Sequence, residues 1–147
     1  MKILVVHHVE ESFCGDEWQQ MDNAQSVVRK ILRHINRTSY DKIILTTMEA
    51  SNSGYHELDK YISVVENWWF GYSPDEVSEY DTEPMVYNED HVYEGHEWLR
   101  VYDWIKELKG HQISVCGGFR NECFLGLTST LDHLGIKYKT IEQCVYG

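Results

Sequence analysis

Four short segments rich in apolar or β-branched residues divide the chain, and each has the length of a β-strand. They cover residues 3–6, 42–47, 112–116 and 136–141. Residues 3–6 are continuously apolar, which is typical of a parallel strand, because a parallel sheet carries helices on both of its faces. The pattern therefore predicts four strands of a parallel sheet.

Between these runs, apolar residues recur at steps of three and four, which is the spacing of one helix face. This spacing predicts helices over residues 19–36, 95–109 and 121–134. Gly110 and Gly135 follow the second and the third of them, as glycine often does at a helix C-terminus. Residues 56–65 have a weaker helical pattern, and residues 85–87 form a candidate short strand.

The alternation of strands and helices is the signature of an α/β fold. Right-handed crossovers between parallel strands place helices on both faces of the sheet. We therefore expect a three-layer sandwich with a mainly parallel sheet and helices on both faces, Rossmann-like in architecture. The 147 residues contain no internal repeat, low-complexity tract or linker, so we expect one domain over residues 1–147.

The net charge of −11 is unevenly distributed along the chain. The interval between Lys60 and Arg100 contains no Lys or Arg but many Asp and Glu residues. A surface of this sign repels phosphate backbones and argues against nucleic-acid binding. A solvated acidic face is the simplest interpretation, and attraction of a cation or a basic partner is the alternative. The interval is also rich in Trp and Tyr, which argues against disorder and suggests that it covers a pocket or a subunit interface.

The N-terminal segment MKILVV lacks the zones of a signal peptide, and no apolar run is long enough to span a membrane. We therefore expect a soluble, cytoplasmic protein. The four cysteines, Cys14, Cys116, Cys123 and Cys144, form no CxxC pair and are expected to be free thiols.

The segment from Cys116 to Cys123, CGGFRNEC, follows a predicted buried strand and precedes a predicted helix. Ligands of open parallel sheets bind outside the carboxyl ends of the strands, and this segment lies at such an end. Cys123 falls in the first turn of the helix, where the positive end of the helix dipole stabilises a thiolate. Backbone N–H groups there can also hold an oxyanion. A small buried hydrophobe is the structural alternative for Cys123.

The stretch VCGGFRNECFLGLTSTLDHLGIKYKTIEQCVYG resembles the C-terminal half of the isochorismatase-like cysteine hydrolases, which include nicotinamidases. The resemblance runs without a gap from Ile113 to about Cys144. It implies that Cys123 is the nucleophile and that a cis peptide bond lies around Gly118-Phe119. It further implies an oxyanion hole formed by the N–H groups of Glu122 and Cys123, and a small amide or ester as the substrate.

Two of the family's three catalytic positions differ in this chain. The family's catalytic Asp falls on His8 in ILVVHHVEESF, and its Lys falls on Tyr87 or Asn88 in MVYNEDHVYEGHEWL. An imidazole can serve as a base or pair with a thiolate, and Asn88 can donate a hydrogen bond without a charge. We therefore expect either a divergent hydrolase that uses Cys123, His8 and Asn88 or a catalytically silent member that binds a small molecule or a protein. His7 is expected on the opposite pleat face, as a satisfied buried histidine.

Four aromatic residues are candidates to line a substrate pocket: Phe13, Trp68, Trp69 and Tyr93. We expect no cofactor and no metal, because neither Glu49 with His56 nor His91 with His96 has the spacing of a known metal motif. Members of the family are often oligomeric, so the resemblance leaves room for a homo-oligomer.

Overall fold

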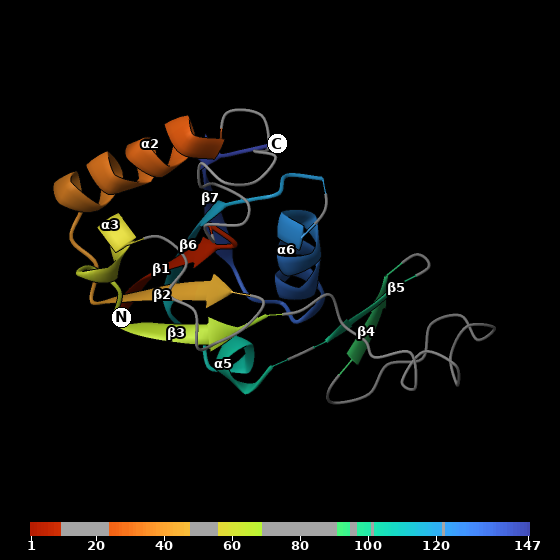
Figure 1. Cartoon of the computed structure of the whole chain (residues 1–147). Coiled ribbons are helices and arrows are strands. Elements are labelled where there is room, and N and C mark those ends of the chain that lie inside the picture. The colour runs from red at the N-terminus through yellow and green to blue at the C-terminus, as the bar shows by residue number, and fades with distance from the viewer. Residues whose placement is uncertain (10–23, 48–55, 69–90, 95–96, 101, 122) are drawn as a thin grey trace.

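The computed structural model describes residues 1–9, 24–47, 56–68, 91–94, 97–100, 102–121 and 123–147. Seven strands and four helices lie in this part of the chain (Figure 1). The strands are β1 (Lys2–His7), β2 (Lys42–Thr47), β3 (Val64–Asn67), β4 (His91–Glu94), β5 (Glu97–Arg100), β6 (Gln112–Gly117) and β7 (Tyr138–Val145). The helices are α2 (Ala24–Arg37), α3 (His56–Asp59), α5 (Asp103–Lys106) and α6 (Cys123–His133).

Five strands form one sheet in the order β3-β2-β1-β6-β7, and every neighbouring pair is parallel. The first strand in the sequence is thus the central strand of the sheet. From β1 the chain builds outward through β2 and β3 on one side, and it returns through β6 and β7 on the other. The predicted α/β class with a parallel sheet is therefore confirmed.

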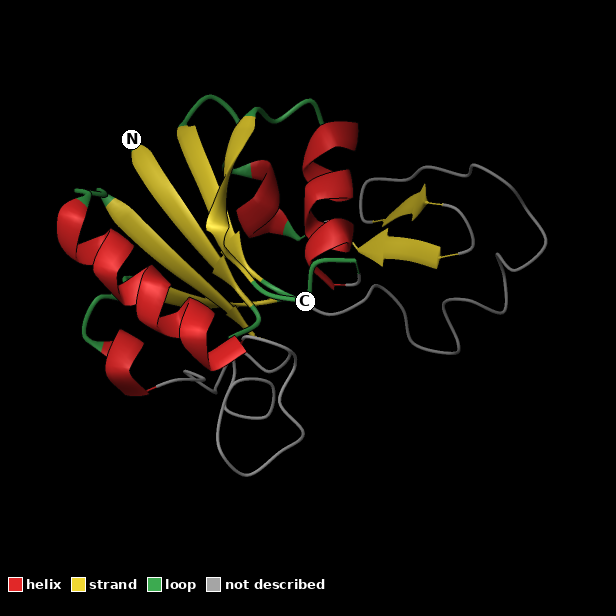
Figure 2. Cartoon of the chain, turned by 90° about the horizontal axis from the view of Figure 1, so that it is seen from above, coloured by secondary structure: helices red, strands yellow, loops and turns green. Residues whose placement is uncertain are grey.

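The sheet is the middle of three layers, with α2 and α3 on one face and α5 and α6 on the other (Figures 1 and 2). Alternate residues of β1 point to opposite faces of the sheet. Leu4 and Val6 pack in the core beneath α2, and Ile3 and Val5 pack beneath α5 and α6. This period of two is the geometry of a strand whose faces are both covered.

From residue 24 onward, the apolar stripe predicted over residues 19–36 forms the buried face of α2, and residues 19–23 lie outside the described residues. Val27, Val28, Ile31 and Ile35 point from this helix into the core beneath it. Burying side chains of this size contributes about 1.5–3 kcal/mol each, which holds the helix on the sheet. The predicted helix at residues 121–134 is found as α6, and the last predicted strand is found as β7.

Two predicted elements are wrong. The helix expected over residues 95–109 is instead a strand, β5, paired antiparallel with β4, followed by the single helical turn of α5. The weak helix expected over residues 56–65 ends at Asp59, and Val64 begins β3. Val64 and Val65 pair with Ile44 and Leu45 of β2, so tertiary pairing outweighs the local helical spacing. The candidate strand at residues 85–87 lies outside the described residues.

None of the helices in the described part of the chain has the length and apolar character needed to cross a membrane.

Candidate functional site

The carboxyl ends of β1 and β6 lie side by side, and His7 at the end of β1 is the register partner of Gly117 at the end of β6. The chain leaves these two strands in opposite directions, toward β2 on one side and toward β7 on the other. In an open α/β sheet such a reversal of strand order marks the place where ligands bind. The candidate site is therefore at this end of β1 and β6.

Gly117 allows the turn after β6 to approach β1 closely. Its φ of 110° is a left-handed conformation that side chains rarely adopt, and a Cβ at this position would overlap the backbone oxygen of His7. The same His7 oxygen accepts a hydrogen bond from the N–H of Gly118 at 2.9 Å. The two strand ends are thus joined by direct backbone contact.

The bond between Gly118 and Phe119 is a cis peptide, at the position that the family resemblance implies. The chain then reaches Cys123, which is the first residue of α6 and is half-buried. The N–H of Phe124 donates to the carbonyl of Phe119 at 3.1 Å, which ties the turn to the start of the helix.

Cys123 differs from the other two described cysteines, although all three are free thiols. Cys116 and Cys144 are buried, and burial raises the pKa of each thiol. Since the thiolate is the reactive form, those two residues suit a structural role. Cys123 lies at a helix N-terminus, where a thiolate is stabilised.

His7 is fully buried and makes a hydrogen bond through each of its ring nitrogens. Nε2 lies 3.2 Å from the carbonyl oxygen of Cys123, and Nδ1 lies 2.6 Å from Oγ1 of Thr46. A carbonyl only accepts, so Nε2 carries the proton and donates it. Burial, followed by the neighbouring His8, lowers the pKa of His7 well below its usual value, so the ring is neutral and Nδ1 accepts from the Thr46 hydroxyl.

His8 follows β1 and has a φ of 49°, in the left-handed region. Three hydrogen bonds help to hold His8 in this conformation. Its N–H donates to the carbonyl of Thr46 at 3.0 Å, its Nε2–H donates to the carbonyl of Trp68 at 2.9 Å, and its own carbonyl accepts from the Tyr146 hydroxyl. Burial lowers the pKa of His8 to about 4, against a smaller opposing effect of the bond to Trp68.

The two imidazoles lie on the same side of β1, with their centroids 4.0 Å apart and their planes 17° apart. The expectation that His7 and His8 occupy opposite pleat faces is therefore wrong. Side chains alternate only while the backbone stays extended, and the left-handed conformation of His8 interrupts the alternation. The Trp68 ring lies edge-on to both histidines, with centroids 4.9 Å from His7 and 5.7 Å from His8.

Tyr146, directly after β7, connects the loops that follow β1 and β6. Its N–H donates to the carbonyl of Gly117 at 2.9 Å, and its hydroxyl donates to the carbonyl of His8. A Cβ on Gly118 would overlap the Tyr146 ring, so the turn and the ring are in close contact. The N–H of Arg120 donates to the carbonyl of Tyr146 at 2.9 Å.

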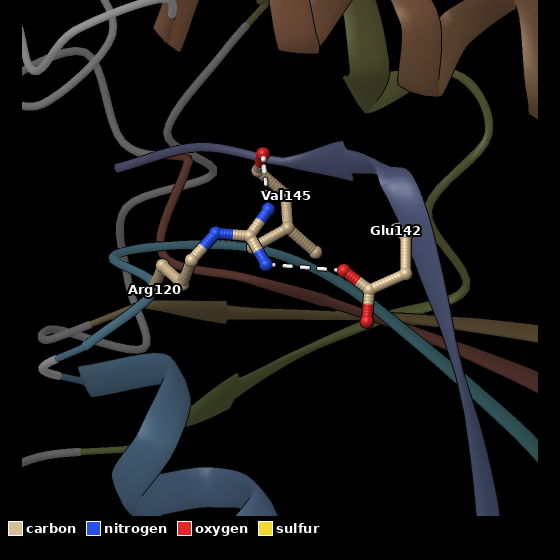
Figure 3. Close-up of polar contacts among 3 residues, drawn as sticks. All are labelled: Arg120, Glu142 and Val145. Carbon is tan, nitrogen blue, oxygen red and sulfur yellow. Dashed lines mark hydrogen bonds and ion pairs between the residues drawn. The ribbon is translucent and has the colours of Figure 1, made fainter.

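Arg120 attaches the turn to β7 through its side chain. Figure 3 shows the guanidinium between two residues of that strand: Nη1 lies 3.0 Å from the Glu142 carboxylate, and Nη2 donates to the carbonyl of Val145 at 3.4 Å. The turn before Cys123 is thus held from β1, through Gly117 and Gly118, and from β7, through Tyr146 and Arg120.

The structure brings together five of the residues predicted from the sequence: His8, Trp68, Gly118, Phe119 and Cys123. Four others, Phe13, Trp69, Asn88 and Glu122, lie outside the described residues, and for Tyr93 only its place in β4 is described. Among the considered metal ligands, Glu49 and His96 also lie outside the described residues, whereas His56 begins α3 and His91 begins β4. The described part of the chain contains no group of three His, Cys, Asp or Glu residues arranged to hold a metal ion.

Sequence reasoning did not select Thr46 or Tyr146, and it assigned His7 to a separate face. The sequence signal that could identify Thr46 is its position one residue before the end of β2, where it is the register partner of His7 in β1. That signal can be used only once β1 and β2 are known to be neighbours.

Comparison of the chain with protein-family models, with curated proteins and with solved structures finds no match. The sheet itself therefore establishes the α/β class, and membership of the isochorismatase-like family remains a prediction from the residues around Cys123.

Proposed function

We propose that the chain is a divergent isochorismatase-like cysteine hydrolase that acts on a small amide or ester through Cys123. The observation that carries the proposal is the placement of Cys123: it begins α6 at the carboxyl end of β6, and its carbonyl accepts a hydrogen bond from His7 of β1. This is the end of the sheet at which an α/β fold binds its ligands.

In the proposed reaction the Cys123 sulfur attacks the carbonyl carbon of the substrate, and its proton passes to a base. The amine or alcohol leaves with a proton, and a thioester remains on Cys123. Water then attacks the thioester, which releases the carboxylic acid and restores the thiol. N–H groups at the start of α6, including that of Cys123, are the proposed donors to the oxyanion.

Of the two roles proposed for His8, its lowered pKa disfavours the ion pair and leaves the general base. A pKa of about 4 leaves the ring neutral at pH 7, so it does not form an ion pair with a thiolate. Because Nε2 donates to Trp68, Nδ1 is the basic nitrogen of the neutral ring. Proton transfer from the Cys123 thiol to so weak a base costs about 1.4 kcal/mol for each unit by which the thiol pKa exceeds that of His8, so turnover is expected to be slow.

A catalytically silent, ligand-binding protein of the same fold is the second candidate. It is favoured by the bonds of the two histidines, each of which donates Nε2–H to a backbone carbonyl as a structural residue does. The ligand in this case would be a small molecule bound at the same ends of β1 and β6.

Two measurements on the full chain test the first proposal. The rate of Cys123 alkylation by iodoacetamide is followed by mass spectrometry between pH 5 and pH 10, with Cys116 and Cys144 as buried internal controls. The hydrolysis of p-nitrophenyl acetate and of a panel of small primary amides is measured in parallel. We expect a Cys123 midpoint clearly below the value of about 8.5 for an ordinary thiol.

The matched variants are Cys123→Ala and Cys123→Ser, with Cys144→Ala as the control. Loss of hydrolysis by about a thousandfold in the two Cys123 variants alone would support the hydrolase. An ordinary alkylation midpoint, or hydrolysis that survives Cys123→Ala, would reject it. Ligand binding that is retained by Cys123→Ala in the absence of any turnover would favour the silent binder.

A further inference from the structure

We propose that His7 is a positioning residue that holds the first turn of α6 in the orientation that makes Cys123 reactive. The inference rests on the proposed role of Cys123 as nucleophile, and it gives a function to a histidine that the reaction scheme does not use. The geometry that points to it is a pair of hydrogen bonds that runs from β2 through the imidazole to the helix.

One end of this connection is Thr46. Its hydroxyl has a single proton and two nearby acceptors: Nδ1 of His7 at 2.6 Å and the carbonyl of Val6 at 3.4 Å. The shorter distance selects His7, in agreement with the neutral ring that lacks a proton on Nδ1. Thr46 is fully buried and its carbonyl accepts from the N–H of His8, so this end is fixed to the sheet.

The other end is the carbonyl of Cys123, the first residue of α6. A helix N-terminus stabilises a thiolate through N–H groups that are aimed at it, and the aim depends on how the first turn is held. His7 approaches this turn from β1, and its ring also lies 6.4 Å from that of Phe124, the next residue of the helix. The imidazole therefore fixes the start of α6 relative to the centre of the sheet.

Both ring nitrogens of His7 take part in these two hydrogen bonds. The residue is therefore suited to holding α6 in place and not to accepting the proton of the Cys123 thiol. Protonation of Nδ1 would break the bond from Thr46, and burial of the ring opposes the added charge. His8, stacked on His7, keeps the role of base.

Other titratable groups lie on the elements around the turn. A comparison of the pH profiles of the variants requires that every variant retains these residues. They are His8 after β1, Cys116 on β6, the Arg120–Glu142 pair between the turn and β7, and Tyr146 after β7. For β4, which also lies against α6, the structure describes the backbone alone. Substitutions confined to His7 and Thr46 leave all of these groups in place.

The test compares two variants that each keep one half of the imidazole. His7→Gln places an amide N–H where Nε2–H donates, and His7→Asn places an amide oxygen where Nδ1 accepts. His7→Leu removes both functions, and Thr46→Val removes the hydroxyl that orients the ring. Each variant is alkylated with iodoacetamide between pH 5 and pH 10, and its fold is checked by circular dichroism and thermal unfolding.

We expect His7→Leu and His7→Asn to raise the pH midpoint of Cys123 alkylation by about one unit, which lowers the rate at acidic pH by about tenfold. We expect His7→Gln to restore a midpoint near that of the wild-type chain, and Thr46→Val to lie between the two. Equal midpoints in the Gln and Asn variants would overturn the inference, and this comparison decides the matter even if His7→Leu does not fold. An ordinary midpoint in the wild-type chain would instead reject the proposed function itself, so the two failures are distinguishable.

Discussion

The imidazole of His8 stacks on that of His7, with 4.0 Å between the ring centroids. Both rings are buried, and burial lowers the pKa of both. A proton on either ring would place a charge in a medium of low polarity and beside the other imidazole. Protonation of either ring is therefore expected to destabilise the stack.

Stability is expected to fall as the pH is lowered from 7.5 to 5. In the unfolded chain His8 takes up a proton near its ordinary pKa of 6.5, whereas in the folded chain it does so only near pH 4. Between these values the unfolded state binds more protons, so protonation favours unfolding. At pH 5 His8 alone removes about 2 kcal/mol of the free energy of unfolding, and His7 acts in the same direction. Urea unfolding at the two pH values measures this loss.

His8→Asn is the control for this pH dependence, because Asn tolerates a left-handed backbone and does not titrate in this range. The difference between the wild-type chain and the variant isolates His8 from the many surface carboxylates. An identical loss of stability in both proteins between pH 7.5 and pH 5 would contradict the assignment.

Replacing Gly117 by Ala is expected to lower the free energy of unfolding by more than about 3 kcal/mol. The new Cβ would meet the backbone of His7, which belongs to the central strand and cannot yield. Gly135→Ala is the matched control, since Gly135 also has a positive φ, of 69°, but has open space around its Cβ position. It should cost about 1 kcal/mol, the strain of the backbone conformation alone. Equal losses in urea unfolding would show that the close approach to His7 does not matter.

Tyr146→Phe is expected to cost about 1–3 kcal/mol, because the buried carbonyl of His8 loses the hydroxyl that donates to it. The ring stays in place against Gly118, so the variant removes one hydrogen bond and little packing. Tyr61→Phe is the control: its hydroxyl donates to Asn36 at 2.9 Å on the exposed surface and should contribute less than about 0.5 kcal/mol. Thermal and urea unfolding measure both, and a loss for Tyr146→Phe no larger than that of the control would contradict the prediction.

Glu142→Gln is expected to change stability by less than about 1 kcal/mol. The Arg120–Glu142 pair is short, at 3.0 Å, but the Glu142 side chain is 71% exposed, and solvent screens such pairs. Any loss should shrink further when salt is raised from 0.05 to about 0.5 M. The opposite result, a loss well above 1 kcal/mol that persists in salt, would mean that the pair holds the turn more strongly than its exposure suggests.

Local sequence was sufficient for four strands of the large sheet and for two of its helices. The run at residues 3–6 is apolar throughout, and residues 43–45 repeat the pattern in the next strand. A strand covered on both faces buries every residue of such a run. The position of Cys123 at the start of a helix follows in the same way, from the glycines before it and the apolar spacing after it.

Local sequence failed where the partner of a segment decides its structure. Val64 and Val65 become a strand because β2 is beside them, and residues 97–100 become a strand because β4 pairs with them. The helical spacing of both segments was real, but pairing with a neighbouring strand outweighs a preference of less than about 1 kcal/mol per residue.

The candidate site shows the same division. The sequence by itself determined the strand ends, the glycine turn and the cysteine that follows it. Only the tertiary structure decided that His7 reaches Cys123, that His8 turns back onto His7, and that Tyr146 joins the two loops. These contacts connect residues that are far apart in the sequence, and one of them depends on a single left-handed residue. Neither the order of strands in a sheet nor one reversed backbone angle leaves a periodic trace in the pattern of apolar and polar positions.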